Sequence, residues 1–239
     1  MTDELTGLRC LIIGAASGIG RTTAQYLRDR RATVMRADRP SDTWRDDATD
    51  KLVMDVTDER SVAAAVGRGV ARMRGLDAVV NTAGVLGAVQ PSAEESAEDF
   101  QRLLTVNLTG AFIVSRTVLP YLVRSDHGRL VHFSSTAGKE GVAGMTGYSA
   151  SKAGVMGLVK ALAREYAHTS VTVNAIAPGK IDTPLLGGTP VGPQDLARIP
   201  MGRLGTAEEA AALVAYMISP AASYTTGAVF DLSGGRATW

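Results

Sequence analysis

Tyr148 and Lys152 lie four positions apart in the segment YSASK. A helix brings residues i and i+4 onto one face, so a phenol and an ammonium group become neighbours. A nearby positive charge favours the phenolate and lowers the pKa of a tyrosine, which ordinarily titrates near ~10. The pair is therefore predicted to exchange a proton with an alcohol or a carbonyl. An isolated Y-x-x-x-K is more often an ordinary helix face, so other motifs must supply the context.

A glycine-rich segment, GAASGIG, follows the apolar run Leu11 to Ile13 and contains Gly14, Gly18 and Gly20. A glycine-rich turn between a strand and a helix lets the backbone approach a pyrophosphate, which the N–H groups and dipole of the helix start attract. Its spacing, G-x-x-x-G-x-G, departs from the commoner G-x-G-x-x-G. The segment predicts a dinucleotide site, with a tight turn lacking a ligand as the alternative.

Asp38 follows a second apolar stretch, Thr33 to Met35, and lies eighteen positions beyond Gly20. A carboxylate at this distance accepts hydrogen bonds from the adenosine ribose and repels a 2'-phosphate, which favours NAD over NADP. Arg36 and Arg39 flank the acid and argue the other way, because an arginine binds such a phosphate.

The motifs occur in a characteristic order: GAASGIG, MDVTD, NTAG, VNLTG, FSS, YSASK, VNAIAPG and TGAVFDLSGG. In this order they resemble the short-chain dehydrogenase/reductase family over nearly the whole chain. The resemblance implies one dinucleotide-binding domain over residues 1–239, with a substrate lid at about 185–200. It implies an enzyme that transfers a hydride between nicotinamide and a secondary alcohol or ketone.

The resemblance also implies catalytic roles for Asn107, Ser135, Tyr148 and Lys152. Tyr148 is the expected general acid/base, and Lys152 is expected to lower its pKa and bind the nicotinamide ribose. A serine hydroxyl is expected to stabilise charge on the substrate oxygen. Because neighbouring strand residues point to opposite faces, only one of Ser134 and Ser135 can do this, and the family spacing selects Ser135. Asn107 is expected to hold a water beside the lysine, or to bond backbone within its helix.

Cofactor contacts follow from the same resemblance. The expected cofactor is NAD, and the expected contacts are Gly14, Ser17, Gly18, Ile19, Gly20, Asp38, Asp55, Val56, Asn81, Ala83, Gly84, Tyr148, Lys152, Pro178, Gly179, Ile181 and Thr183. Asn81 has a structural alternative as a brace between strands. The family usually has threonine before its first glycine, where this chain has Ile13, so the detail of the loop is open.

Apolar strands alternate with helical patterns along the 239 residues. The strands are expected near 9–13, 33–37, 52–55, 76–80, 129–134, 171–176 and 229–232. Such alternation predicts a doubly wound sheet with right-handed crossovers. The expected fold is therefore α/β and Rossmann-type, with a mostly parallel seven-stranded sheet, helices on both faces and a single domain. Its ligand should lie at the carboxyl ends of the strands.

Composition limits the partners. The net charge of +1 gives no basic footprint for nucleic acid or an anionic membrane surface. We expect no signal peptide, no run long enough to span a bilayer, and a cytoplasmic location. Cys10 stands alone and is expected to be buried. His127, His132 and His168 lack metal-ligand spacing, so no metal is expected.

The helix that carries Tyr148 has small residues at Ala150, Ala153, Gly154 and Gly157. In this family that helix and the preceding long one usually pack against partner subunits, which favours a homotetramer. Close packing within one chain accounts for the same residues equally well.

The substrate is the least determined feature. The glycine- and proline-containing segment from Leu185 to Pro200 is expected to cover the pocket, with Leu185 and Leu186 offering apolar contacts. Val142 and Met145 are candidates for the opposite wall. Together they favour a neutral, partly apolar alcohol or ketone, in which a cyclic compound is one option.

Three functions therefore compete. The first is an NAD-dependent dehydrogenase of a secondary alcohol. The second is a 3-oxoacyl-carrier-protein reductase, for which Arg129 is a candidate docking residue, while Thr169 and Asp38 argue against it. The third is a catalytically silent nucleotide-binding regulatory protein, which would not need the four catalytic residues together.

Overall fold

Seven short apolar segments form one sheet in the computed structural model, which describes residues 4–41, 44, 49–186 and 192–237. All neighbouring strands pair in parallel, in the order β3-β2-β1-β4-β5-β6-β7. The strands are β1 (Arg9–Ile13), β2 (Thr33–Asp38), β3 (Lys51–Val53), β4 (Ala78–Asn81), β5 (Arg129–Phe133), β6 (Thr172–Pro178) and β7 (Val229–Leu232). The predicted Rossmann-type, single-domain fold is confirmed, with strand bounds within a few residues of those expected.

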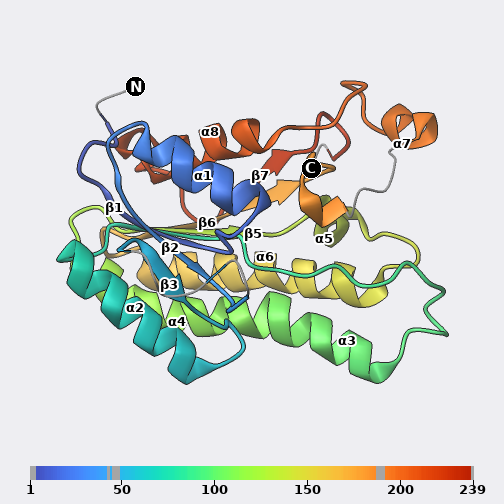
Figure 1. Cartoon of the computed structure of the whole chain (residues 1–239). Coiled ribbons are helices and arrows are strands. Elements are labelled where there is room, and N and C mark those ends of the chain that lie inside the picture. Colours follow the sequence, from blue (N-terminus) through green and yellow to red (C-terminus); the bar gives the residue numbers. More distant parts are fainter. Residues whose placement is uncertain (1–3, 42–43, 45–48, 187–191, 238–239) are drawn as a thin grey trace.

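Helices cover both faces of the sheet (Figure 1). One face carries α1 (Gly18–Arg28) and α8 (Ala207–Ile218), and the other carries α2 (Glu59–Met73), α4 (Gly110–Leu122) and α6 (Thr146–Tyr166). Each face buries its own apolar cluster, because a parallel sheet between two helical layers is hydrophobic on both sides. The strand order reverses between β1 and β4, and a crevice opens there at the carboxyl ends of the strands.

The long helical pattern before β5 forms a single rod with an irregular centre. It consists of α3 (Ala97–Leu104), a π-helical turn η1 (Thr105–Thr109) and α4. The N–H of Gly110 donates to the carbonyl of Thr105, five residues back. Such turns are frequent at functional sites, and this one carries Asn107.

The same rod, Ala97–Leu122, is long and apolar enough to cross a membrane by length and composition. The expectation that no segment reaches this length is therefore wrong. Half of its most apolar window is buried within the fold, as in the core helix of a globular domain. It packs against α2, α6 and strands β4 and β5.

Shorter helices complete the end of the molecule at which the strands terminate. They are α5 (Thr136–Glu140), the 3-10 turn η2 (Pro184–Leu186) and α7 (Pro193–Ala197), and a further 3-10 turn, η3 (Pro220–Ala222), follows α8. Segment 187–191 of the expected lid lies outside the described residues. The described helical elements in the region of the expected lid are η2 and α7.

Candidate active site

Tyr148 occupies the first turn of α6, and Lys152 follows it on the same face. The Lys152 Nζ lies 5.8 Å from the centroid of the Tyr148 ring. Both side chains are buried, Tyr148 being 9% and Lys152 5% exposed. The predicted juxtaposition of phenol and ammonium is therefore present.

Two hydrogen bonds lock this part of α6 to the end of β5. The Lys152 Nζ donates to the carbonyl of Phe133 at 2.9 Å, and the Ser134 hydroxyl donates to the carbonyl of Lys152 at 2.7 Å. Gly138 lets α5 approach equally closely, because a Cβ there would lie 2.6 Å from the Lys152 carbonyl carbon. The ammonium group and the backbone of Lys152 are thus both held by hydrogen bonds.

Ser135 and Ser134 have different partners, as strand alternation predicts. The Ser135 oxygen accepts a hydrogen bond from the N–H of Ala137 at 3.1 Å and so caps α5. Its hydroxyl also hydrogen-bonds the phenol of Tyr148. Ser134 is committed to the backbone of α6. The structure therefore brings Ser135, the residue selected by the family spacing, to the tyrosine.

The pKa of Tyr148 differs from the sequence expectation. Burial raises the pKa of this phenol, and the hydrogen bond from Ser135 opposes the shift without reversing it. The expected lowering by Lys152 is thus wrong for the chain alone, because desolvation of the phenolate is the larger effect. Burial also lowers the pKa of Lys152 to about 8. Tyr148 is consequently a protonated donor at neutral pH.

Asn107 uses its side-chain amide to hold the segment after β4. Its Oδ1 accepts from the N–H of Val85 at 2.9 Å, and its Nδ2 donates to the Val85 carbonyl at 3.1 Å and to Ser151 Oγ at 3.0 Å. A Cβ on Gly84 would lie 3.1 Å from Asn107 Oδ1 and 3.2 Å from Lys152 Nζ. Asn107 therefore braces the backbone of the segment after β4, beside the lysine, and not that of its own helix as the structural alternative had it. Its water-holding role stays a prediction.

The glycine-rich turn has no room for side chains at two of its glycines. A Cβ on Gly20 would lie 2.2 Å from the Gly14 carbonyl oxygen, and one on Gly14 would lie 2.7 Å from the N–H nitrogen of Ala83. Gly14 also has φ +82°, a conformation that favours glycine. The turn leads into α1, whose N-cap is Ser17. This close-packed turn at a helix start fits the pyrophosphate of a dinucleotide.

Thr82 supplies a hydroxyl to this turn and was missed by the sequence analysis. Its Oγ1 donates to the carbonyl of Ile13 at 2.8 Å and lies 3.2 Å from that of Gly14. Ile13 stands where the family usually has a threonine, which left the detail of the loop open. The Thr82 hydroxyl, directly after β4, supplies a hydroxyl group to the turn in its place. The available signal was a threonine in NTAG, directly after a strand that pairs with β1.

Asp38 ends β2 and faces the same turn. Its Oδ2 accepts from the N–H of Ala16 and its Oδ1 from the N–H of Arg39, both at 2.7 Å. These bonds fix the carboxylate at the rim of the crevice, where it retains lone pairs for ribose hydroxyls.

A cavity of about 270 Å³ runs from the glycine-rich turn to Tyr148 and Lys152. The predicted residues that line it are Gly14, Ser17, Gly18, Ile19, Gly20, Asp38, Val56, Ala83, Gly84, Tyr148, Lys152 and Thr183. Leu185, which was expected to offer an apolar contact to the pocket, lines it too. Residues not predicted as cofactor contacts also line it, namely Ile13, Arg39, Met54, Thr82, Val85, Val106, Phe133 and Ser134. Asp38 and Tyr148 thus face one continuous space.

Five of the predicted cofactor-binding residues do not line this cavity. Asp55 Oδ1 accepts from the N–H and hydroxyl of Thr57, and Asn81 bonds the N–H of Ala83 and lies 3.3 Å from His132 Nδ1. These contacts match the bracing role left open for Asn81. Pro178 ends β6, Gly179 packs against Ser233, and Ile181 is buried beside Gly205. None of these residues is among those that line the cavity.

An apolar cluster adjoins the Tyr148 ring. It contains Leu103, Ala137 and Tyr148, with Val85, Leu86, Val142 and Met145 packed against it. Val142 and Met145, expected as the wall of the pocket opposite the lid, pack in this cluster with Tyr148 but are not among the residues that line the cavity. Among the described residues, no group of three His, Cys, Asp or Glu side chains could hold a metal ion.

Comparison with known proteins agrees with this geometry. Residues 14–237 match the family model described as enoyl-(acyl carrier protein) reductase. This match, together with the relatives below, shows that the chain belongs to the short-chain dehydrogenase/reductase family.

Three similar proteins illustrate the range of that family. The chain is 40% identical to 2-dehydro-3-deoxy-L-rhamnonate dehydrogenase (NAD(+)) of a Sphingomonas species, covering 97% of this chain and 96% of the relative. It is 38% identical to a 3-oxoacyl-[acyl-carrier-protein] reductase of Thermotoga maritima, covering 97% and 98%. A crystal structure of the Brucella melitensis 3-ketoacyl-(acyl-carrier-protein) reductase complexed with NADH has a TM-score of 0.91 at 30% identity, covering 98% of this chain and 100% of that one.

We predict that Thr82→Val weakens NADH binding by roughly fivefold and lowers the free energy of unfolding by about 1 kcal/mol, since it removes one hydrogen bond to the turn. Isothermal titration and urea unfolding measure the two effects. Thr82→Ser retains the hydroxyl and should behave like the natural chain. Unchanged NADH affinity in Thr82→Val would show that this hydroxyl does not organise the turn.

Proposed function

We propose that this chain is an NAD(H)-dependent oxidoreductase that interconverts a secondary alcohol and a ketone, with Tyr148 as the general acid/base. The observation that carries the proposal is that Tyr148 and buried Lys152 line one end of the cavity, with Ser135 in contact with the Tyr148 phenol. Membership of an oxidoreductase family and an NADH-bound structural neighbour support it.

The proton step follows from the two hydroxyl groups. A substrate carbonyl oxygen placed between the hydroxyl groups of Ser135 and Tyr148 would accept one hydrogen bond from each. Tyr148 then gives its proton to the oxygen during reduction and takes one back during oxidation. The charge of Lys152 stabilises the phenolate that forms, and burial strengthens this effect. When bound, NADH would supply the hydride for reduction of the ketone, and NAD+ would accept it in oxidation of the alcohol.

The cofactor would be held by the residues that line the cavity. The backbone at Gly14 to Gly20 would accommodate the pyrophosphate, Asp38 the adenosine ribose, and Lys152 the nicotinamide ribose. The fit is supported by the absence of space for a Cβ at Gly14 and Gly20. A carboxylate at Asp38 favours NAD. A similar dehydrogenase that is named for NAD(+) supports this choice.

The substrate would enter between the apolar cluster and the lid. Val142 and Met145 would form one wall and Leu185, which is 55% exposed, the other. Of the described elements in the expected lid, α7 is tied to the segment after β6 by an ion pair of 2.6 Å between Asp195 and Lys180. We therefore place the lid at about 185–200 and propose a neutral, partly apolar alcohol or ketone as substrate.

A reductase acting on carrier-bound 3-oxoacyl groups is the second candidate. Two of the three similar proteins described above carry names of this class. The expected docking residue does not support it, because Arg129 is only 3% exposed and its Nη1 donates to the carbonyls of Gly128 and Ser170. A surface-exposed guanidinium is what an acidic carrier would require. A silent regulatory protein is a weaker third candidate, because a binding module needs no proton donor.

Assembly and location complete the proposal. Ala150, Ala153 and Gly157 are exposed along α6, whereas a Cβ on Gly154 would lie 2.6 Å from Leu108 of the same chain. Packing within one chain therefore explains Gly154, and the exposed small residues support contact with a second α6 in a homotetramer. We place the enzyme in the cytoplasm, as expected from its sequence.

Tyr148→Phe should lower kcat by roughly 10²- to 10⁴-fold while NADH still binds, because the ring remains and only the proton donor is removed. A panel of secondary alcohols and ketones, followed by nicotinamide absorbance, gives the rates. Tyr166→Phe on the same helix is the matched control and should retain activity. A nearly normal rate for Tyr148→Phe would refute the assigned role.

The pH profile tests Lys152. Its pKa is lowered to about 8, so its ammonium is present below that pH and is lost above it. We predict that kcat/KM for ketone reduction is level below about pH 8 and falls above it, since the phenolate loses its stabilising charge. Initial rates between about pH 6 and pH 10 measure this, and a level profile to the upper limit would contradict it.

A further inference from the structure

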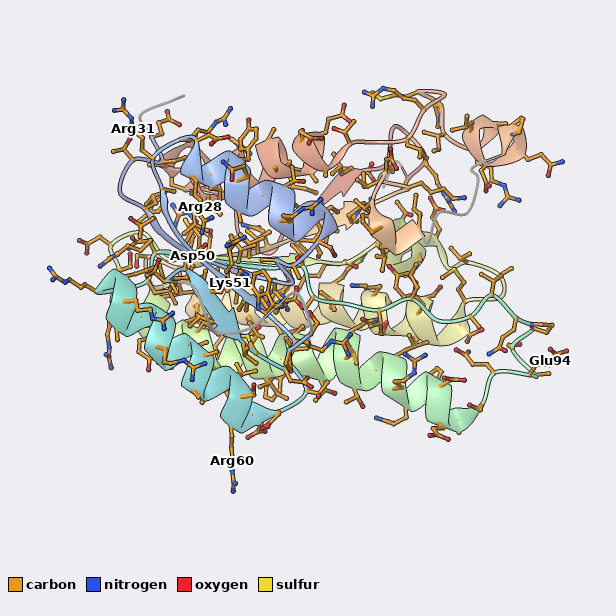
Figure 2. All side chains as sticks on the ribbon, in the orientation of Figure 1. Arg28, Arg31, Asp50, Lys51, Arg60 and Glu94 are labelled. Carbon is orange, nitrogen blue, oxygen red and sulfur yellow. The ribbon has the colours of Figure 1, made fainter. Side chains whose placement is uncertain are left out.

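Asp50 lies directly before β3 and binds two arginines of neighbouring elements. Its Oδ2 accepts from Nε of Arg36 on β2 at 2.7 Å and also from Nη2 of Arg28 on α1. The three side chains are partly buried, with 20% to 29% of each exposed. Figure 2 shows Arg28 and Asp50 at the same side of the molecule, around β2 and β3.

A second contact restrains the Arg36 guanidinium. Its Cζ lies over the ring of Trp44, 5.4 Å from the centroid, and Trp44 itself is buried with its Nε1 donating to the Leu52 carbonyl at 2.9 Å. The backbone N–H of Arg36 also donates to the carbonyl of Asp50 at 2.8 Å. An ion pair and an aromatic ring thus hold the arginine in place.

The position of Arg36 matters because Asp38 lies two residues further along the same strand. Residues i and i+2 of a strand share one face, about 7 Å apart. Arg36 is therefore a long cation on the face of the acid that would receive the adenosine ribose. Arg39 already lines the cavity. A released Arg36 would join it as a second partner for a 2'-phosphate, and arginine binds phosphate well.

We propose that Asp50 determines cofactor specificity by holding Arg36 away from the adenosine ribose, which keeps the site selective for NAD over NADP. The inference rests on the proposed function, in which that ribose lies at Asp38. Asp50 acts through Arg36 and is a positioning residue. The Asp38 carboxylate repels the 2'-phosphate of NADP. Asp50 binds the Arg36 guanidinium, which would otherwise be available to offset that repulsion.

The charge on Asp50 is consistent with this role. Burial raises the pKa of its carboxyl, but hydrogen bonds from Arg36 and Arg28 outweigh that effect and the pKa is lowered overall. The carboxylate therefore stays ionised at neutral pH and neutralises part of the charge of two arginines.

The test compares direct binding of NADH and NADPH by nicotinamide fluorescence in purified variants, without substrate. Asp50→Ala should tighten NADPH binding about tenfold and change NADH binding less than about twofold, since one charge-assisted contact to phosphate is gained. Asp50→Ala with Arg36→Gln should lose this gain. Asp50→Ala with Arg28→Gln is the matched control and should keep it, because Arg28 lies on another element.

The binding results distinguish a wrong role for Asp50 from a wrong function for the protein. Unchanged NADPH affinity in Asp50→Ala, or a gain that depends on Arg28 and not on Arg36, would overturn the proposal. Arg36→Gln alone offers a second test if Asp50→Ala does not fold. It should leave NADPH affinity within about twofold, whereas a tenfold loss would show that Arg36 already reaches the phosphate. Failure of the natural chain to bind NADH would instead count against the proposed function.

Discussion

The site depends on the double attachment of α6 to the end of β5. The Lys152 ammonium reaches the Phe133 carbonyl, and the Ser134 hydroxyl reaches the Lys152 carbonyl. These bonds set both the height and the rotation of the helix against the sheet. Tyr148, one helical turn earlier, is thereby placed against Ser135, the next residue of the chain after Ser134. The end of β5 is thus followed by one serine that fixes the helix and one that contacts Tyr148.

Burial gives this arrangement its chemical character. A fully exposed lysine would remain charged far above neutral pH, whereas the Lys152 pKa falls to about 8 because the ammonium is removed from water. The same burial keeps Tyr148 protonated, ready to donate. His132, behind Asn81, has its pKa lowered to about 4 by burial and by the charge of Lys152, so it contributes no competing charge. Desolvation therefore tunes the pair, and hydrogen bonds orient it.

The repeating features of the chain made the fold predictable. Apolar runs and glycine punctuation located all seven strands, and strand alternation with family spacing selected Ser135 over Ser134. These features depend on local sequence and on periodicity. The glycine-rich turn was likewise recognisable, because close backbone approach at Gly14 and Gly20 leaves no choice of residue.

Contacts between distant segments were not predictable in the same way. The Thr82 hydroxyl reaches Ile13 across 69 positions, and Asp50 joins Arg28 to Arg36 only once β3 lies beside β2. The long helix around Asn107 was predicted from its pattern, but the π-helical turn within it was not. The pKa of Tyr148 was misjudged because the sequence displays the neighbouring charge but not the degree of burial. A pKa shift caused by desolvation can be assessed only when the folded structure shows how deeply the group is buried.

The central claim is that Tyr148, Ser135 and Lys152 surround the reacting end of a nicotinamide bound in this cavity. A crystal structure of the protein with NADH tests it most directly. We predict a pyrophosphate over the turn from Gly14 to Gly20 and a nicotinamide ring facing the Tyr148 hydroxyl, with Lys152 at its ribose. A structure in which the cofactor is bound but these two side chains point away from the ring would contradict the account.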